Sequence, residues 1–280
     1  MDDLAEAKIL VTGATDGLGK HVAFELAASD ATVLLHGRSR ERLETTIEEI
    51  RRDTGNEKLG SYLADLSSLG EVRALAEQVL AEQDRLDVLI NNAGVIEGNR
   101  RESEDGYELT FAVNYLACFL LTHLLLPLLR DSAPARVVNV ASAGQSPIDF
   151  DDVMLDHGYD AMRAYTQSKL AQVMFAFELA ERLRGSGVTV NALHPASLME
   201  TKMVLETFGR SMSTVEEGAE ATVRLAASPE LEGVTGRYFD GTREARADPQ
   251  AYDEEARKRL WALSEDLCGR LLEPAGAADA

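Results

Sequence analysis

The sequence predicts a doubly wound, mostly parallel α/β sheet of about seven strands with helices on both faces. Short aliphatic or β-branched runs recur along the 280 residues, and amphipathic helical patterns separate most of them. The runs are almost continuously apolar, as is typical of strands that are buried on both sides. With 45% hydrophobic residues, the chain can bury the core of such a sheet.

The expected elements alternate along the chain. Strands are predicted at residues 8–13, 32–37, 58–66, 86–94, 136–142, 188–195 and 236–241. Helices are predicted at 19–29, 41–53, 69–83, near 104–130 and at 161–185, where apolar residues recur at helical spacing. Right-handed crossovers between parallel strands then place helices on both faces of the sheet.

The net charge and the number of cysteines exclude several classes of binding partner for this protein. The net charge of −20 repels nucleic acid phosphates and anionic membranes, so we expect neither as a partner. Cys118 and Cys268 are too few for a disulfide framework or a zinc site, and we expect no metal. The acidic N-terminus lacks the pattern of a secretory signal, which favours a cytoplasmic location.

Residues 109–129 are apolar and about long enough to cross a bilayer. Asn114, Tyr115, His123 and Pro127 interrupt the segment, and basic clusters do not flank it on one side. We therefore interpret it as a helix that is buried on most faces and expect no integral membrane span.

The first predicted strand ends in TGATDGLGK, residues 12–20. Gly13, Gly17 and Gly19 stand between a strand and the start of a helix, where a dinucleotide pyrophosphate binds in this class of fold. Glycines permit a tight turn there, and the helix start supplies free N–H donors. A plain glycine-rich connection is the less favoured alternative.

The second predicted strand ends in HGRSRER, residues 36–42. An NAD-preferring site holds an acidic residue at this strand end, but here Gly37 is followed by Arg38. A guanidinium matches a 2′-phosphate, so we expect NADP(H) to be preferred and NAD(H) to be possible. The alternative is that Arg38 is a surface charge at the start of the next helix.

The stretch AYTQSKLAQ, residues 164–172, places Tyr165 and Lys169 on the same face of a helix. Reduction of a carbonyl needs a proton donor, and a nearby ammonium favours the phenolate of a tyrosine whose pKa is ordinarily near 10. Ser142 closes the fifth strand, and Asn114 is a polar residue inside an apolar helix. Taken singly, these two could be a turn residue and a helix-kink amide.

The G-x-x-x-G-x-G spacing, the NNAG at residues 91–94, Ser142 and the Tyr165/Lys169 pair together resemble the short-chain dehydrogenase/reductase family. The resemblance extends from residue 8 to about residue 270 and points to the single-domain branch. The interval of 23 residues from Ser142 to Tyr165 and the C-terminal part resemble the retinol-dehydrogenase-like branch. This implies one Rossmann-type domain over residues 1–273, with a flexible tail at 274–280.

The resemblance also implies a role for each site residue. Tyr165 is the general acid/base, Lys169 lowers its pKa and holds the cofactor ribose, Ser142 orients the carbonyl, and Asn114 supports a water relay. Asp65 would face the adenine, although it could instead be a local helix-start acid near Ser67. The residues expected to bind the cofactor are Gly13, Thr15, Asp16, Gly17, Leu18, Gly19, Arg38, Ser39, Asp65, Leu66, Asn92, Ala93, Gly94, Tyr165, Lys169, Pro195 and Leu198.

The sequence departs from the family pattern at three positions. Asp16 stands where NADP-preferring relatives often have a basic residue. Ala196 replaces a glycine after Pro195, and Thr201, whose counterpart contacts the nicotinamide carboxamide, comes one residue late.

Residues 197–213 fall where the family has its mobile substrate lid, and their apolar side chains could line a lipophilic pocket or belong to a helix core. The expected activity is interconversion of a carbonyl and an alcohol on a medium-sized apolar small molecule, such as a retinoid, steroid, lipid or xenobiotic. A non-catalytic dinucleotide-binding regulator or scaffold is the alternative, disfavoured by the complete set of four catalytic residues. Helices 109–129 and 165–183 could form a homodimer or homotetramer interface, or be core.

Overall fold

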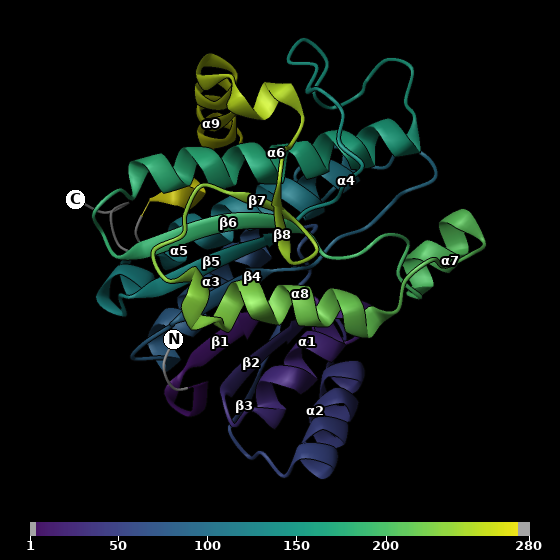
Figure 1. Ribbon diagram of the computed structural model, residues 1–280. Coiled ribbons are helices and arrows are strands. Elements are labelled where there is room, and N and C mark those ends of the chain that lie inside the picture. Colours follow the sequence, from purple (N-terminus) through teal and green to yellow (C-terminus); the bar gives the residue numbers. More distant parts are fainter. Residues whose placement is uncertain (1–3, 274–280) are drawn as a thin grey trace.

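Within residues 4–273, which the computed structural model describes, eight strands form one sheet in the order β3-β2-β1-β4-β5-β6-β7-β8 (Figure 1). Pairing is parallel throughout except between β7 and β8, which are antiparallel. The strands are β1 Lys8–Val11, β2 Thr32–Gly37, β3 Leu59–Leu63, β4 Val88–Asn91, β5 Ala135–Val140, β6 Val188–His194, β7 Tyr238–Asp240 and β8 Arg243–Ala245. The predicted doubly wound parallel sheet is confirmed, with β8 as an eighth strand that the sequence did not indicate.

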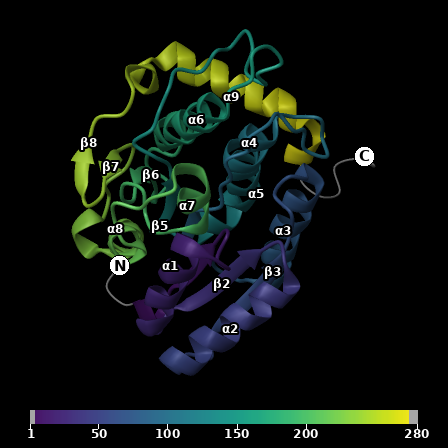
Figure 2. The same ribbon diagram turned by 90° about the vertical axis from the view of Figure 1, so that its right-hand side faces the viewer.

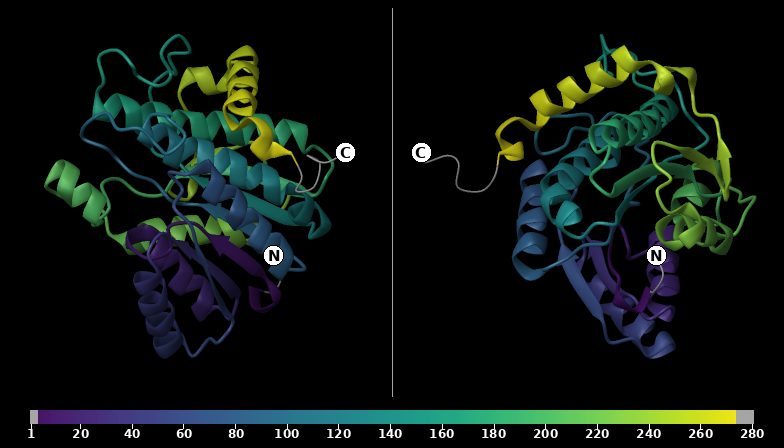
Figure 3. Two further views of the ribbon diagram at one scale, coloured as in Figure 1. Left: turned by 180° about the vertical axis from the view of Figure 1, so that it is seen from behind. Right: turned by 60° about the vertical axis from the view of Figure 1, so that its left-hand side comes forward.

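Helices cover both faces of the sheet (Figures 1 and 2). One face carries α1 (Gly17–Ala28), α2 (Arg40–Thr54) and α8 (Val215–Ala227), whose buried residues form a core cluster with alternate strand residues. The other face carries α3 (Leu69–Glu82), α5 (Ala117–Asp131) and α6 (Ala161–Arg182) over a second cluster. The remaining α9 (Glu254–Cys268) lies along the outside of α6, as the right-hand view of Figure 3 shows.

Polar caps fix the starts of the helices that lead away from the strand ends. Asp16, Ser39 and Ser68 cap α1, α2 and α3 by accepting hydrogen bonds from backbone N–H groups of the first turn. Such caps satisfy donors that have no partner within the helix. Each of these helices therefore begins within a few residues of the carboxyl end of the strand before it.

The helix expected near residues 104–130 begins later and is irregular. Glu108 caps a short α4 (Leu109–Phe111) by accepting from the N–H groups of Thr110 and Phe111. A π-helical turn, Ala112–Leu116, then precedes α5. The added backbone residue in a π turn shifts the side chains relative to a regular helix, and such turns are frequent at functional sites.

The stretch from Leu109 to Asp131 is the one helix among residues 4–273 that is long and apolar enough to cross a membrane by length and composition, with a hydropathy of 1.8. In this structure 78% of that apolar window is buried. Its side chains pack in the core beneath the sheet with those of α3 and α6.

The strand order reverses between β1 and β4, which is the topological switch point of a doubly wound sheet. Ligands in this class of fold bind outside the carboxyl ends of the strands at that point. The predicted tail, residues 274–280, lies outside the described residues, and the assignment of residues 1–273 to a single domain stays a prediction.

Candidate active site

The glycine-rich turn joins the end of β1 to the start of α1. Gly13 and Gly17 have positive φ angles of 66° and 48°, a region that L side chains rarely adopt. A Cβ at Gly19 would lie 2.3 Å from the Gly13 carbonyl oxygen and 2.4 Å from Asn92 Nδ2. The turn is thus packed so closely that a side chain at Gly19 has no room, which leaves the backbone free to approach and cradle a pyrophosphate.

The first turn of α1 opens onto this cradle. Asp16 accepts a hydrogen bond from the Gly17 N–H at 2.8 Å. The N–H groups of Leu18 and Gly19 follow, and at this position of a helix they have no partner within the helix. Together with the positive end of the helix dipole they fit a pyrophosphate. The Leu18 side chain is buried in the core, so this residue can offer a cofactor only its backbone.

His36 in β2 supports the glycine turn from below, a role that the sequence reasoning missed. Its Nδ1 accepts from the Gly13 N–H at 3.2 Å, so its Nε2 carries the proton and contacts the Ala64 carbonyl oxygen at 3.1 Å. Burial lowers the pKa of His36 to about 4, and the neutral imidazole ties β1, β2 and the end of β3 together. The feature of the sequence that could have indicated this role is a histidine near the end of an otherwise apolar strand.

We expect His36 to make stability depend on pH. Its folded pKa of about 4 lies below the ordinary value of 6.5, so the unfolded chain takes up a proton that the folded chain does not as pH falls through this window. Between pH 6.5 and about 5, the wild type should lose about 2 kcal/mol more unfolding free energy than His36→Gln, which does not titrate. Urea unfolding at both pH values measures this, and an equal loss in the two proteins would contradict it.

The end of β4 is fastened to the end of β1. Asn92 Nδ2 donates to the carbonyl oxygens of Thr12 at 2.8 Å and Gly13 at 3.3 Å. The N–H of Ala93 donates to Thr12 Oγ1 at 3.1 Å. Asn92 and Ala93, both expected to contact the cofactor, thus also hold the glycine turn in shape.

Gly94 leads from this turn to the catalytic residues. A Cβ at Gly94 would lie 3.3 Å from Asn114 Oδ1 and 3.5 Å from Lys169 Nζ. Asn114 is fully buried in the π-helical turn, where its Oδ1 accepts from the Val95 N–H at 2.8 Å and its Nδ2 donates to Ser168 Oγ at 3.0 Å. Its side chain therefore fixes the segment after β4 against α6, next to the lysine.

Ser142 and Tyr165 lie beyond the end of β5, close enough for the serine hydroxyl to lower the pKa of the phenol. Ser142 Oγ accepts from the Gly144 N–H at 3.0 Å, which leaves the hydroxyl hydrogen for another acceptor. The Ser142 carbonyl oxygen accepts from Tyr238 Oη at 3.0 Å and from Gln145 Nε2 at 2.8 Å. The side chains of Gln145, three residues along, and of Tyr238, in β7, thus hold the serine in position.

Lys169 is buried beside these groups, with its Nζ 5.7 Å from the centre of the Tyr165 ring. The Nζ donates to the Val140 carbonyl oxygen at 2.8 Å and to Gln172 Oε1 at 2.9 Å. Burial lowers the pKa of the ammonium to about 8. Gln172 was not among the predicted site residues, although it lies one helical turn after Lys169.

Burial raises the pKa of Tyr165 above its ordinary value of 10, and the nearby Ser142 hydroxyl only partly offsets that rise. Tyr165 is therefore held as a neutral phenol, the form that can donate a proton. The Lys169 ammonium is hydrogen-bonded to Val140 and Gln172 in this arrangement, and its expected lowering of the Tyr165 pKa stays a prediction.

Residues after β2 and β3 lie around the glycine turn. Arg38 is exposed, and Ser39 caps α2 by accepting from the Arg42 N–H at 3.4 Å. Asp65 Oδ1 accepts from the Ser67 N–H at 2.9 Å. One of the two carboxylate oxygens thus makes the local helix-start contact that was the alternative to binding adenine. Leu66 beside Asp65 is buried, and contact of either residue with an adenine stays a prediction.

The segment 197–213 forms the short α7 (Lys202–Phe208), which projects from the body of the molecule in Figure 1. None of the α7 residues is buried, so the helix-core alternative is wrong for α7, whereas Met199 before it packs against a core cluster. Thr201 caps α7, and its Cγ2 would lie 3.1 Å from a Cβ at Gly17. The start of α7 thus lies against the glycine turn, after the buried Pro195 and the half-buried Leu198.

Comparison with known proteins agrees with this geometry. Residues 7–210 match the family model described as short chain dehydrogenase. Retinol dehydrogenase 13 of Mus musculus is 42% identical over 278 residues, covering 93% of this chain and 83% of that protein.

Two solved structures are similar in fold. An uncharacterised protein from Mycobacterium paratuberculosis superposes with a TM-score of 0.77 at 30% identity, covering 95% of this chain and 94% of that one. An active-site complex of Pseudomonas aeruginosa RhlG with NADP has a TM-score of 0.71 at 30% identity, covering 85% of this chain and 95% of that one. The fold neighbours thus support a nicotinamide dinucleotide as the cofactor.

The exclusion of a membrane partner is corrected by these findings. The matched relatives are retinol dehydrogenases, and the helix from Leu109 to Asp131 is long and apolar enough for a span. The acidic net charge argues against binding to anionic membrane surfaces. It does not bear on whether an apolar helix inserts into the hydrocarbon core of a membrane. The prediction that the protein has no integral membrane span is therefore withdrawn, whereas a small-molecule substrate is consistent with the relatives.

Proposed function

The chain belongs to the short-chain dehydrogenase family, and from that premise we propose that it is an NADP(H)-dependent oxidoreductase that interconverts a carbonyl and an alcohol on a medium-sized apolar substrate. The observation that carries the proposal is the grouping of Ser142, Tyr165 and the buried Lys169 beyond the carboxyl end of β5, with Lys169 Nζ 5.7 Å from the centre of the Tyr165 ring. A protein that only binds a dinucleotide has no need of this grouping.

Tyr165 donates the proton in the reductive direction. Burial favours its neutral phenol, so the proton is already on Oη before a carbonyl arrives. Ser142 Oγ, whose lone pair is engaged by the Gly144 N–H, directs its hydrogen toward the same substrate oxygen and polarises it. A nicotinamide cofactor, when bound, would supply the hydride in this direction and accept it in the other.

Lys169 and Asn114 complete the proton path. Lys169 lies over the Tyr165 ring with a pKa of about 8, so the buried amine can exchange a proton near neutral pH. The two oxygens that accept from Lys169 Nζ, on Val140 and Gln172, are uncharged. The ammonium can therefore leave them for other oxygen acceptors without breaking an ion pair. Asn114, which with Lys169 faces Gly94, supports the relay from Lys169 to solvent.

The lid favours an apolar substrate. Leu205 and Phe208 of α7 are 44% and 41% exposed, and Met212 after it is 70% exposed. Apolar side chains on a projecting segment gain free energy when they close over an apolar molecule. Because the relatives are named for retinol, we place retinoid-like aldehydes and alcohols first among the candidates.

The preference for NADP(H) rests on Gly37 and Arg38 at the end of β2. A Cβ at Gly37 would lie 2.6 Å from Thr15 Cγ2, so an acidic side chain has no room there. We expect Arg38→Ala to weaken NADP+ binding roughly tenfold and to leave NAD+ binding within about twofold. Titration calorimetry with both cofactors measures this, and unchanged NADP+ affinity would remove Arg38 from the site.

The function itself is tested with a panel of carbonyls and both reduced cofactors. We expect oxidation of NADPH with apolar aldehydes such as retinal, and a lower kcat/KM with NADH. A folded protein that binds NADPH but turns over none of the panel would instead favour a binding role. The cytoplasmic location stays a prediction.

A further inference from the structure

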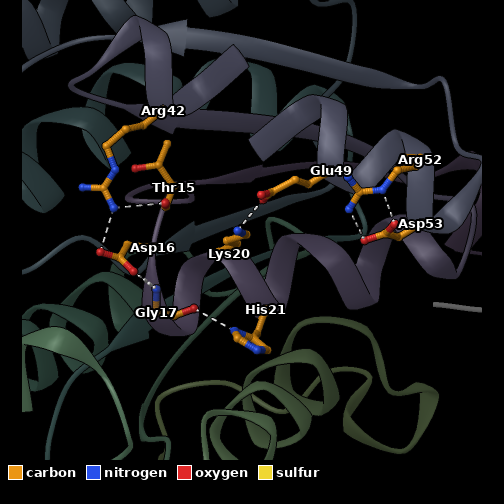
Figure 4. A network of polar contacts seen from close by, with 9 residues as sticks. All are labelled: Thr15, Asp16, Gly17, Lys20, His21, Arg42, Glu49, Arg52 and Asp53. Carbon is orange, nitrogen blue, oxygen red and sulfur yellow. Dashed lines mark hydrogen bonds and ion pairs between the residues drawn. The ribbon is translucent and has the colours of Figure 1, made fainter. Parts of the chain in front are cut away.

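Arg42 extends from the first turn of α2 to the glycine turn (Figure 4). Its Nη2 donates to Asp16 Oδ2 at 2.7 Å and to the Thr15 carbonyl oxygen at 3.3 Å. Both contacts use the same nitrogen, and no other side-chain hydrogen bond of Arg42 occurs within residues 4–273. The remaining N–H groups of the guanidinium are thus available to a further acceptor.

Asp16 is the residue that most disfavours a phosphorylated ribose here. Its carboxylate stands at the glycine turn, one residue from a backbone cradle that suits an anion. Partial burial acts against ionisation, but the contacts with Arg42 and the Gly17 N–H hold the pKa of Asp16 below its ordinary value of 3.8. The carboxylate is therefore ionised, and unless it is neutralised it opposes the charge of a 2′-phosphate.

The pair is not needed as a brace between α1 and α2. Lys20 of α1 already forms an ion pair with Glu49 of α2, as Figure 4 shows. The side chains of Arg42 and Asp16 are each 53% exposed, and exposed pairs of this kind contribute only about 0–1 kcal/mol to stability. Arg42 is therefore free to share its guanidinium with a ligand at little cost to the fold.

We propose that Arg42 is a second specificity determinant for the 2′-phosphate, because it neutralises Asp16 and presents its unused N–H groups to the phosphate beside Arg38. This inference rests on the proposed NADP(H) preference. It explains how a chain with an acidic residue in the glycine turn accommodates a phosphorylated cofactor.

The test is a double-mutant cycle of Arg42→Gln and Asp16→Asn, with NADP+ and NAD+ dissociation constants measured by titration calorimetry. Asparagine still caps α1, so the second variant removes charge without removing the cap. The control is Arg52→Gln, which breaks an exposed ion pair with Asp53 at the opposite end of α2. It reports the effect of losing a positive charge at a distance.

We expect Arg42→Gln to weaken NADP+ binding about tenfold with Asp16 present and about threefold in the Asp16→Asn background. NAD+ binding should change less than about twofold in every variant, as should NADP+ binding in the Arg52→Gln control. Equal losses for both cofactors, or equal NADP+ losses in both backgrounds, would overturn the role of Arg42 alone. A wild type that prefers NAD+ would overturn the proposed cofactor and this inference together.

Discussion

Tyr165→Phe is expected to lower kcat for carbonyl reduction by about a thousandfold or more, while the dissociation constant for NADPH stays within about twofold. The phenol is the only group in the proposed mechanism that gives its proton to the substrate oxygen. Removing one hydroxyl leaves the ring that lies beneath Lys169 Nζ, so the surroundings of the site are retained. Steady-state turnover and cofactor titration on the same preparation measure both quantities.

Tyr252→Phe is the control for this variant, because it also removes one phenol hydroxyl, and the Tyr252 Oη accepts from the Ala247 N–H, outside the proposed catalytic set. It should leave kcat unchanged. Turnover by Tyr165→Phe at more than about a tenth of the wild-type rate would contradict the role of the phenol.

Gly19→Ala is expected to weaken cofactor binding by more than about a hundredfold and to lower the unfolding free energy by about 1–3 kcal/mol. The added Cβ would lie 2.3 Å from the Gly13 carbonyl oxygen and 2.4 Å from Asn92 Nδ2, so the glycine turn and the end of β4 must move apart. Alanine is otherwise the better helix former, so any destabilisation comes from this clash.

Gly70→Ala in α3 provides the comparison. Its Cβ would meet only Ser68 Oγ at 3.7 Å, an ordinary contact. This variant should be as stable as the wild type or more stable, by up to about 1 kcal/mol, with unchanged cofactor binding. If Gly19→Ala behaved in the same way in titration and urea unfolding, the cradle described for the glycine turn would be wrong.

The parts of this molecule that follow from local sequence were predictable. Strand and helix positions were anticipated because apolar runs and helical periodicity are local patterns, and β2 begins and ends where expected. Ser142 follows the carboxyl end of β5, the edge where a parallel sheet binds ligands, and helical segments bring Asn114, Tyr165 and Lys169 to the same edge. The short β8 was missed, since only three residues pair with β7.

The interactions that were missed join residues far apart in the sequence. His36 contacts Gly13 across β1 and β2, Tyr238 contacts Ser142 from the last parallel strand, and Arg42 contacts Asp16 between two helices. No spacing rule reports such pairs, because they depend on strand order and on side-chain direction. The spacing of Lys169 from Tyr165 was recognised in the sequence, but the hydrogen-bond acceptors of Lys169 were not, because they too depend on the direction of its side chain.

The central claim, that this chain transfers a hydride to an apolar carbonyl, is tested most directly with NADPH that carries deuterium at C4 of the nicotinamide, supplied in each of its two stereochemical forms. The product alcohol from an apolar aldehyde such as retinal is then analysed by mass spectrometry. We predict one deuterium on the carbinol carbon with one of the two forms, and none from Tyr165→Phe within the same reaction time. Product alcohol without deuterium from both forms, or no alcohol from a folded wild type that binds NADPH, would contradict the claim.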